Sequence, residues 1–204
     1  MEPLAKIFGS PARLKALRLF AFNQDTAFSP ADIATRAKLS REVVQGELAE
    51  LVASGLLRKS RRLRSGSRPL RASGKGARSA ARYQVNARFE HLPALNAFIR
   101  ETTSVRPQKI IAALKRAGAL RLVVLSGHFS GILEPQIDLL VVGDHLDERS
   151  LAHAVHALEA ELGREIRYAS FATVDFRYRL GVYDRLLRDV FDYPHRVLID
   201  KIGL

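Results

Sequence analysis

One stretch of the sequence, residues 51–89, contains no acidic side chain and eleven basic ones. The formal net charge of the whole 204-residue chain is +12, so all other residues together carry only +1. A patch of this density raises a positive potential that attracts polyanions and speeds their encounter. Its basic residues are Arg58, Lys59, Arg61, Arg62, Arg64, Arg68, Arg71, Lys75, Arg78, Arg82 and Arg88.

The composition excludes several other classes of protein. The chain has no cysteine, which excludes disulfides, thiolate zinc sites and cysteine nucleophiles. No apolar run reaches the roughly 18 residues of a membrane span, and the N-terminus lacks the pattern of a signal peptide. Hydrophobic residues make up 47% of the chain, enough for a packed core. We expect a cytoplasmic protein with no membrane partner.

Upstream of the basic stretch, the sequence predicts a series of helices. Residues 4–22 have helical periodicity, interrupted near Gly9-Ser10-Pro11. A second helix starts at Ser29-Pro30, a capping residue followed by proline, and ends near Lys38. A third is capped by Ser40 and stopped by Gly55. Its predicted buried side comprises Val43, Val44, Leu48, Leu51 and Val52, and its predicted outer face Arg41, Glu42, Gln45 and Gly46.

The basic stretch itself predicts two strands with a long connection. Residues 56–64 and 81–86 are expected to pair, and residues 65–80 between them are rich in Gly, Ser and Arg. One interpretation is a solvated linker whose charge is incidental. The other is a long hairpin whose arginines neutralise phosphates or enter a minor groove, and the absence of acidic residues favours it.

The N-terminal half resembles a known family. Residues 8–17, Phe-Gly-Ser-Pro-Ala-Arg-Leu-Lys-Ala-Leu, are similar to the opening helix of ArsR-type winged-helix regulators, and residues 39–57 to their recognition helix and its exit. The resemblance covers residues 4–86 and implies a dimeric transcriptional regulator that binds double-stranded DNA. The residues expected to contact DNA are Ser40, Arg41, Gln45, Arg58, Lys59, Arg61, Arg62, Arg64, Arg68, Arg71, Lys75 and Arg78.

The C-terminal half changes its periodicity. After helices over residues 89–103 and 107–117, strands are predicted at 120–126, 136–143 and 165–171, with a helix at 151–162 and helical turns from 174 to 191. The aromatic residues Tyr168, Phe171, Phe176 and Tyr178 are expected in its core. The predicted fold class is thus a two-domain α+β and α/β chain: a winged helix-turn-helix over 1–88, a connecting helix over 89–105, and a mixed sheet with helices over 106–204.

This second domain resembles the nucleotidyltransferase fold of the DNA polymerase beta superfamily, over residues 106–204. Members carry Gly-Ser after the first strand, an Asp-x-Asp pair on the second and a third carboxylate later, which together hold two magnesium ions. Here His128 follows Gly127, Gln136 precedes Asp138 in the pair, and the third strand contains Arg167. A single remaining carboxylate cannot balance two divalent ions. The departures predict a pseudoenzyme without catalytic residues, metal or cofactor.

Two roles remain open for such a domain. It is either a dimerisation scaffold or a sensor that keeps a cleft for a small-molecule or nucleotide effector near Gly127, His128 and Asp138. Two rival functions for the whole chain are an active nucleotidyltransferase and a nucleic-acid-binding protein that does not distinguish sequences.

Overall fold

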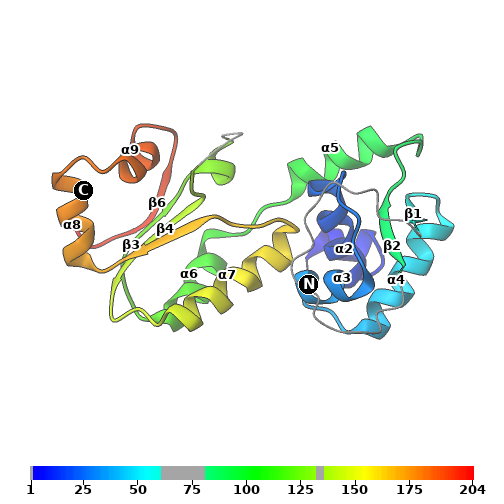
Figure 1. The fold of residues 1–204 in the computed structure, drawn as a ribbon, viewed down its shortest axis with the longest axis horizontal. Coiled ribbons are helices and arrows are strands. Elements are labelled where there is room, and N and C mark those ends of the chain that lie inside the picture. The colour runs from blue at the N-terminus through cyan, green and yellow to red at the C-terminus, as the bar shows by residue number, and fades with distance from the viewer. Residues whose placement is uncertain (1, 61–80, 132–135) are drawn as a thin grey trace, which may run out of the picture. The chain divides into compact units, whose positions relative to one another are not determined.

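The structure is a computed structural model that describes residues 2–60, 81–131 and 136–204. The chain mixes helices with β-strands and divides into two compact units (Figure 1). Unit 1 consists of Met1–Ser104 and Ala160–Arg164. Unit 2 consists of Val105–Glu159 and Glu165–Leu204. Residues 89–105, expected as a connector, therefore lie almost wholly within unit 1.

Unit 1 is built of five helices and a two-stranded antiparallel hairpin in its described part. The elements are α1 (Pro3–Ile7), α2 (Pro11–Phe22), α3 (Pro30–Ala37), α4 (Arg41–Ala53), β1 (Leu57–Ser60), β2 (Arg82–Val85) and α5 (Leu92–Thr102). The predicted break at residues 9–11 is confirmed: Gly9 has a positive φ of 89°, and Ser10 caps α2 by accepting from the amide of Arg13. The predicted antiparallel pairing is confirmed for residues 57–60 with 82–85, and residues 61–64 of the predicted first strand lie outside the described residues.

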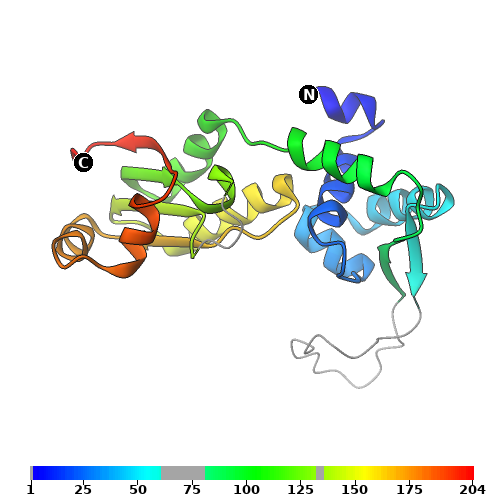
Figure 2. The same ribbon diagram turned by 90° about the horizontal axis from the view of Figure 1, so that it is seen from above.

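The hydrophobic core of unit 1 is centred on α2, which packs against the other helices and the hairpin. Phe20 and Leu14 on α2 are 2% exposed and pack with residues of α3, α4, the hairpin and α5. On α5, Ile99 is buried in the same core, which explains why this helix belongs to unit 1 and is not a free connector. Figure 2 shows β1 and β2 side by side at one side of these helices.

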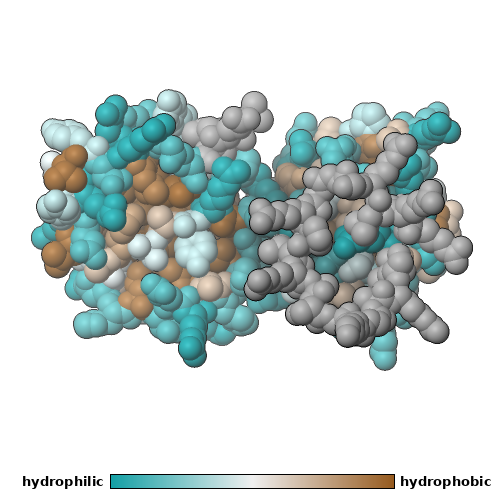
Figure 3. Space-filling model, viewed as in Figure 1, coloured by the Kyte–Doolittle hydropathy of each residue, from teal (hydrophilic) through white to brown (hydrophobic). Residues whose placement is uncertain are grey.

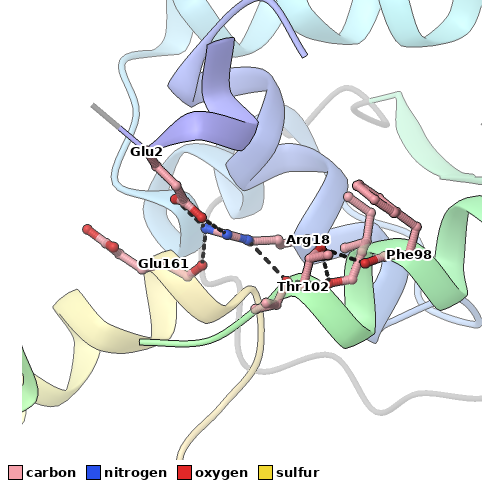
Figure 4. Close-up of polar contacts among 7 residues, drawn as sticks. Glu2, Arg18, Phe98, Thr102 and Glu161 are labelled. Atoms are coloured by element: carbon pink, nitrogen blue, oxygen red, sulfur yellow. Dashed lines mark hydrogen bonds and ion pairs between the residues drawn. The ribbon is translucent and has the colours of Figure 1, made fainter. Parts of the chain in front are cut away.

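A buried arginine joins several segments of unit 1. The guanidinium of Arg18, on α2, is paired with the carboxylate of Glu2 and donates to the Thr103 hydroxyl at 3.2 Å and to the Glu161 carbonyl at 3.1 Å (Figure 4). Gly163 adopts a φ of +75°, and a Cβ there would lie 2.4 Å from the backbone carbon of Arg18. Residues 160–164 thus pack directly against the α2 backbone, and only glycine fits at 163.

Unit 2 is a four-stranded mixed sheet with helices. Its elements are α6 (Pro107–Leu114), the 3-10 turn η1 (Lys115–Ala117), β3 (Ala119–Leu125), the 3-10 turn η2 (Gly127–Ser130), β4 (Leu139–Asp144), α7 (Glu148–Leu162), β5 (Tyr168–Phe171), α8 (Thr173–Gly181), α9 (Arg185–Phe191) and β6 (Arg196–Asp200). The strand order is β5-β4-β3-β6. β4 and β5 are parallel and joined through α7, whereas β3 is antiparallel to both β4 and β6.

Alternation along the strands directs side chains to both faces of this sheet. Leu122 and Val124 of β3 pack with Phe176 of α8 and with Leu187 and Val190 of α9. α6 and α7 lie along the opposite face (Figure 1). Because both faces are covered, all the residues of β4 except Asp144 are buried.

The structure corrects several sequence-based expectations in unit 2. The strands expected from residues 136 and 165 begin at Leu139 and Tyr168, and β6 was not predicted at all. Phe176 is fully buried as expected. Tyr168 and Tyr178 were also expected in the core, but Tyr168, at the start of β5, is 37% exposed, and Tyr178 is 72% exposed because α8 turns only its Phe176 side toward the sheet. Apolar surface is visible over α8 and α9 in Figure 3.

Candidate nucleic-acid interface

Local sequence signals determine where α3 begins and ends and where α4 begins. Ser29 and Asp32 form a reciprocal capping box at the start of α3. The Ser29 hydroxyl accepts a hydrogen bond from the Asp32 amide, and the Asp32 carboxylate accepts one from the Ser29 amide. α3 ends at Ala37, and the next residue, Lys38, has a left-handed φ of 50° that turns the chain sharply. Ser40 then caps α4 by accepting from the amide of Val43. Two helices joined by a three-residue turn result.

Three residues on one side of α4 attach it to the core. Val44, Leu48 and Leu51 are at most 6% exposed. We call the exposed residues of its first two turns, Arg41, Glu42, Val43, Gln45 and Gly46, the outer face of α4. Val43 was predicted to be buried and is instead 43% exposed, because the adjacent Val44 takes the inward position.

Glu47 fixes the rotation of α4 about its own axis. Its carboxylate accepts from the Ser10 hydroxyl at 2.6 Å and from the Arg13 guanidinium at 2.7 Å. Ser10 and Arg13 belong to the first turn of α2, so the contact ties the middle of α4 to the start of α2. We call this contact the Glu47 clamp. The sequence pattern gave no sign of it, because its partners are separated by more than 30 residues.

The hairpin presents two of the predicted basic residues. Arg58 pairs with Gln84 across the strands, and its guanidinium donates to the Gln84 side chain at 3.3 Å. Both Arg58 and Lys59 are exposed, whereas Leu57 beside them is buried. Arg82, on the other strand, is engaged within the unit: its guanidinium donates to the Ala27 carbonyl at 2.8 Å and lies 3.7 Å from the Asp32 carboxylate.

The other predicted phosphate-binding residues lie outside the described residues. They are Arg61, Arg62, Arg64, Arg68, Arg71, Lys75 and Arg78. In the described part of the chain, β1 ends at Ser60, just before this segment, and β2 begins at Arg82, just after it.

Charge is divided unevenly between α4 and the hairpin. α4 contains one arginine and three glutamates, of which Glu47 is neutralised by Arg13. Glu42 and Glu50 remain exposed on the same helix. α4 by itself is therefore not a polyanion-binding element, and the net positive charge of the chain is concentrated in residues 51–89.

In unit 2, the structure brings Gly127, His128 and Asp138 together. The Asp138 side chain is buried, and its carboxylate accepts from the amide of His128 at 2.8 Å and from the amide of Arg167 at 3.0 Å. It thereby joins the turn after β3 to the segment before β5. The sequence pattern allowed either Arg167 or a neighbouring residue to point inward here, and the structure shows Arg167 exposed and Ile166 buried. Both oxygens of the Asp138 carboxylate thus accept hydrogen bonds from backbone amides of the same chain.

Two kinds of feature are absent from the described residues. No group of three or more His, Asp or Glu side chains there is arranged to hold a metal ion. In the same ranges, no helix has both the length and the hydropathy that a membrane span requires.

The chain was also compared with known proteins. No protein-family model, no curated protein and no solved structure matched it.

Proposed function

We propose that the protein is a DNA-binding transcriptional regulator whose unit 1 is a winged helix-turn-helix. In this proposal α3 and α4 are the helix-turn-helix, and β1 and β2 with the basic segment between them form a long wing. The observation that carries the proposal is the geometry of α4: a helix clamped to the core through Glu47, with Arg41 and Gln45 exposed beside a strongly basic hairpin. A helix presented in this way fits a major groove.

In this proposal, α4 and the hairpin contact different parts of the DNA. Arg41 is suited to bidentate contact with guanine and Gln45 with adenine, each worth about 1–3 kcal/mol of discrimination. Arg58, Lys59 and the basic residues of the acid-free segment would contact phosphates, which position the protein but read no sequence. Ser40 supports the first turn of α4, whose free amide groups favour a nearby phosphate.

For unit 2 we propose a degenerate nucleotidyltransferase-like domain that does not catalyse. The engagement of Asp138 with the amides of His128 and Arg167 supports a structural role for the one carboxylate that remains of the family's pair. Dimerisation is the role we favour, since a homodimer would place two winged helices on a two-fold operator. A small-molecule or nucleotide effector is the second role to test.

A rival function has one observation in its favour. Because α4 carries Glu42 and Glu50 and the net positive charge is concentrated in residues 51–89, a protein that binds nucleic acid through this stretch alone would have the same charge distribution. Such a protein would not distinguish sequences.

Duplex binding across a salt series separates the two. A preferred duplex, selected from a random pool, and a scrambled duplex of equal length are titrated with the full chain. A regulator binds the preferred duplex about a thousandfold more tightly or better at moderate salt. Arg41→Ala then reduces this preference, with little change in the salt dependence. Equal affinities for every duplex would contradict the regulator and support the sequence-neutral binder.

A further inference from the structure

The outer side of α8 carries exposed apolar side chains in a row. Val174, Tyr178 and Val182 follow one another at intervals of four residues, and we call them the α8 stripe. Val182 continues the helical pattern, since its amide donates to the Tyr178 carbonyl at 3.1 Å. The three therefore share one side of the helix, and their exposed fractions are 78%, 72% and 55%. Phe176, on the opposite side, is fully buried against the sheet.

Exposed apolar residues are concentrated around this stripe. Of the twelve large hydrophobic side chains that are exposed in the described ranges, five lie within ten residues, namely Val174, Tyr178, Leu180, Val182 and Tyr183. Apolar surface over α8 is visible in Figure 3. Single exposed apolar residues are normal on a protein surface, whereas a contiguous group of them marks a surface that another molecule covers.

The charges around the stripe indicate which kind of molecule fits. Residues 173–192, which contain α8 and α9, include four arginines and four aspartates and so carry no net charge. Six of these eight form ion pairs with one another: Arg179–Asp184, Arg185–Asp189 and Arg188–Asp192. A neutral surface attracts neither a nucleic acid nor an anionic membrane. In a chain with a net charge of +12, it is also a surface where a second copy can approach without strong repulsion.

The other two charges flank the stripe. Asp175 and Arg177 are exposed, and within the described residues neither forms an ion pair. Asp175 follows Val174 and Arg177 precedes Tyr178, so at 100° per residue they lie on opposite flanks of the stripe. When two α8 helices lie in parallel about a two-fold axis, the Asp175 flank of each faces the Arg177 flank of the other. The two residues are then offset by about 3 Å along the helix, which an arginine side chain can span.

We infer that two copies of this chain associate through the α8 stripe, with their α8 helices packed in parallel. Val174 and Tyr178 of each copy then contact the same residues of the other, as an isologous interface requires. Asp175 of each copy pairs with Arg177 of the other, which gives two identical ion pairs. The inference rests on the proposed function in one respect, the choice of dimerisation as the role of unit 2, and it adds the surface and the orientation.

The first experiment exchanges the two charges. Self-association of the full chain is measured without DNA, by light scattering over a range of concentrations. Asp175→Arg and Arg177→Asp each place like charges opposite one another, so each variant alone should dimerise at least about tenfold more weakly than the wild type. An equimolar mixture of the two variants should form a heterodimer, because their flanks are then complementary. Native mass spectrometry distinguishes the three possible dimers by mass.

The second experiment removes the apolar contact. The double change Val174→Ser and Tyr178→Ser should weaken self-association about a hundredfold, since large side chains at the centre of an interface dominate its affinity. Ile7→Ser is the matched control, because Ile7 is 73% exposed on α1 of unit 1. This control should dimerise as the wild type does.

The outcomes test the α8 contact separately from DNA binding. A wild type that stays monomeric at every concentration overturns the inference, and so does a mixture of the charge variants that associates no better than either one alone. If Ile7→Ser abolishes the dimer and the α8 variants leave it intact, the interface lies on unit 1. A wild type that dimerises through α8 but binds no duplex overturns the proposed regulator and leaves the α8 contact standing.

Discussion

At the scale of single residues, the Glu47 clamp ties one flank of α4 to the start of α2. The Glu47 side chain is 13% exposed and that of Arg13 is 33% exposed, so the pair is only partly screened by water. The hydrophobic contacts of Val44, Leu48 and Leu51 hold α4 against the core. The clamp adds a directional contact on one flank, which apolar packing alone does not provide.

We therefore predict that Glu47→Gln lowers the free energy of unfolding by about 1–2 kcal/mol. The change removes the charge from two hydrogen bonds, and the partial exposure of Arg13 keeps the loss at the low end of the range for charged groups. Urea denaturation measures it. Glu50→Gln, on the exposed side of the same helix, should change the value by less than about 0.5 kcal/mol. A loss as small as that of the control would contradict the clamp.

Asp138 is the second residue whose role the structure changes. Its carboxylate accepts two amide hydrogen bonds inside unit 2, where no water competes. Asp138→Asn keeps the shape but turns an NH₂ group toward one of these amides. We predict a loss of about 1–3 kcal/mol in the free energy of unfolding, the cost of a buried donor left without an acceptor.

Urea denaturation of this variant should be compared with that of Asp175→Asn, which alters an exposed carboxylate on α8. An Asp138→Asn variant as stable as the control would show that the carboxylate is not needed for folding. Asp138 would then become a candidate for the nucleotide cleft, and nucleotide binding would be the next measurement.

At the scale of elements, the hairpin and α4 are expected to affect binding in different ways. Contacts from α4 to base edges change with the sequence of the duplex, whereas contacts from the hairpin to phosphates do not. Phosphate contacts also release condensed counterions, so each one contributes to the salt dependence of binding.

We predict that the double change Arg58→Gln and Lys59→Gln reduces the slope of log affinity against log salt by about 2, since each lost phosphate contact contributes about 0.9. The affinity should fall equally for preferred and scrambled duplexes. Lys115→Gln with Arg116→Gln is the matched control, because these residues are exposed in unit 2 and the change in charge is the same. An unchanged slope for the hairpin variant would refute the phosphate contacts.

At the scale of the whole molecule, the proposed function predicts how many chains bind one DNA site. A winged helix of this size reads one short half-site, and a homodimer reads two that are related by a two-fold axis. We predict a mass by light scattering of twice the 22.7 kDa of one chain. On duplexes with two half-sites, affinity should be greatest at centre-to-centre spacings of about 10–10.5 base pairs or multiples of this.

A monomer at every concentration that binds duplexes one to one, with no dependence on spacing, would contradict the dimer. The assignment of DNA contacts to unit 1 would be unaffected by that result, because none of the contacts proposed for α4 or the hairpin involves a second chain.

Much of the local structure followed from the sequence, because it depends on neighbours along the chain. Ser10, Ser29 and Ser40 were recognised as helix caps from residue type and position, and each accepts the hydrogen bond expected of it. The antiparallel pairing of residues 57–60 with 82–85 followed from two short runs flanking a polar segment. The concentration of charge between residues 51 and 89 is a property of the sequence alone.

Contacts between distant residues were decided only by the tertiary structure. Helical periodicity allowed both Val43 and Val44 on the buried side of α4, and the packing of α4 against its neighbours selected Val44. β6 could not be predicted, because five residues with charged ends become a strand only when β3 offers an edge to pair with. Asp138 looked like a remnant of a metal site until its hydrogen-bond partners were known. Hydrogen-bond geometry and burial depend on where the folded chain brings residues together, and this is information that spacing along the sequence does not contain.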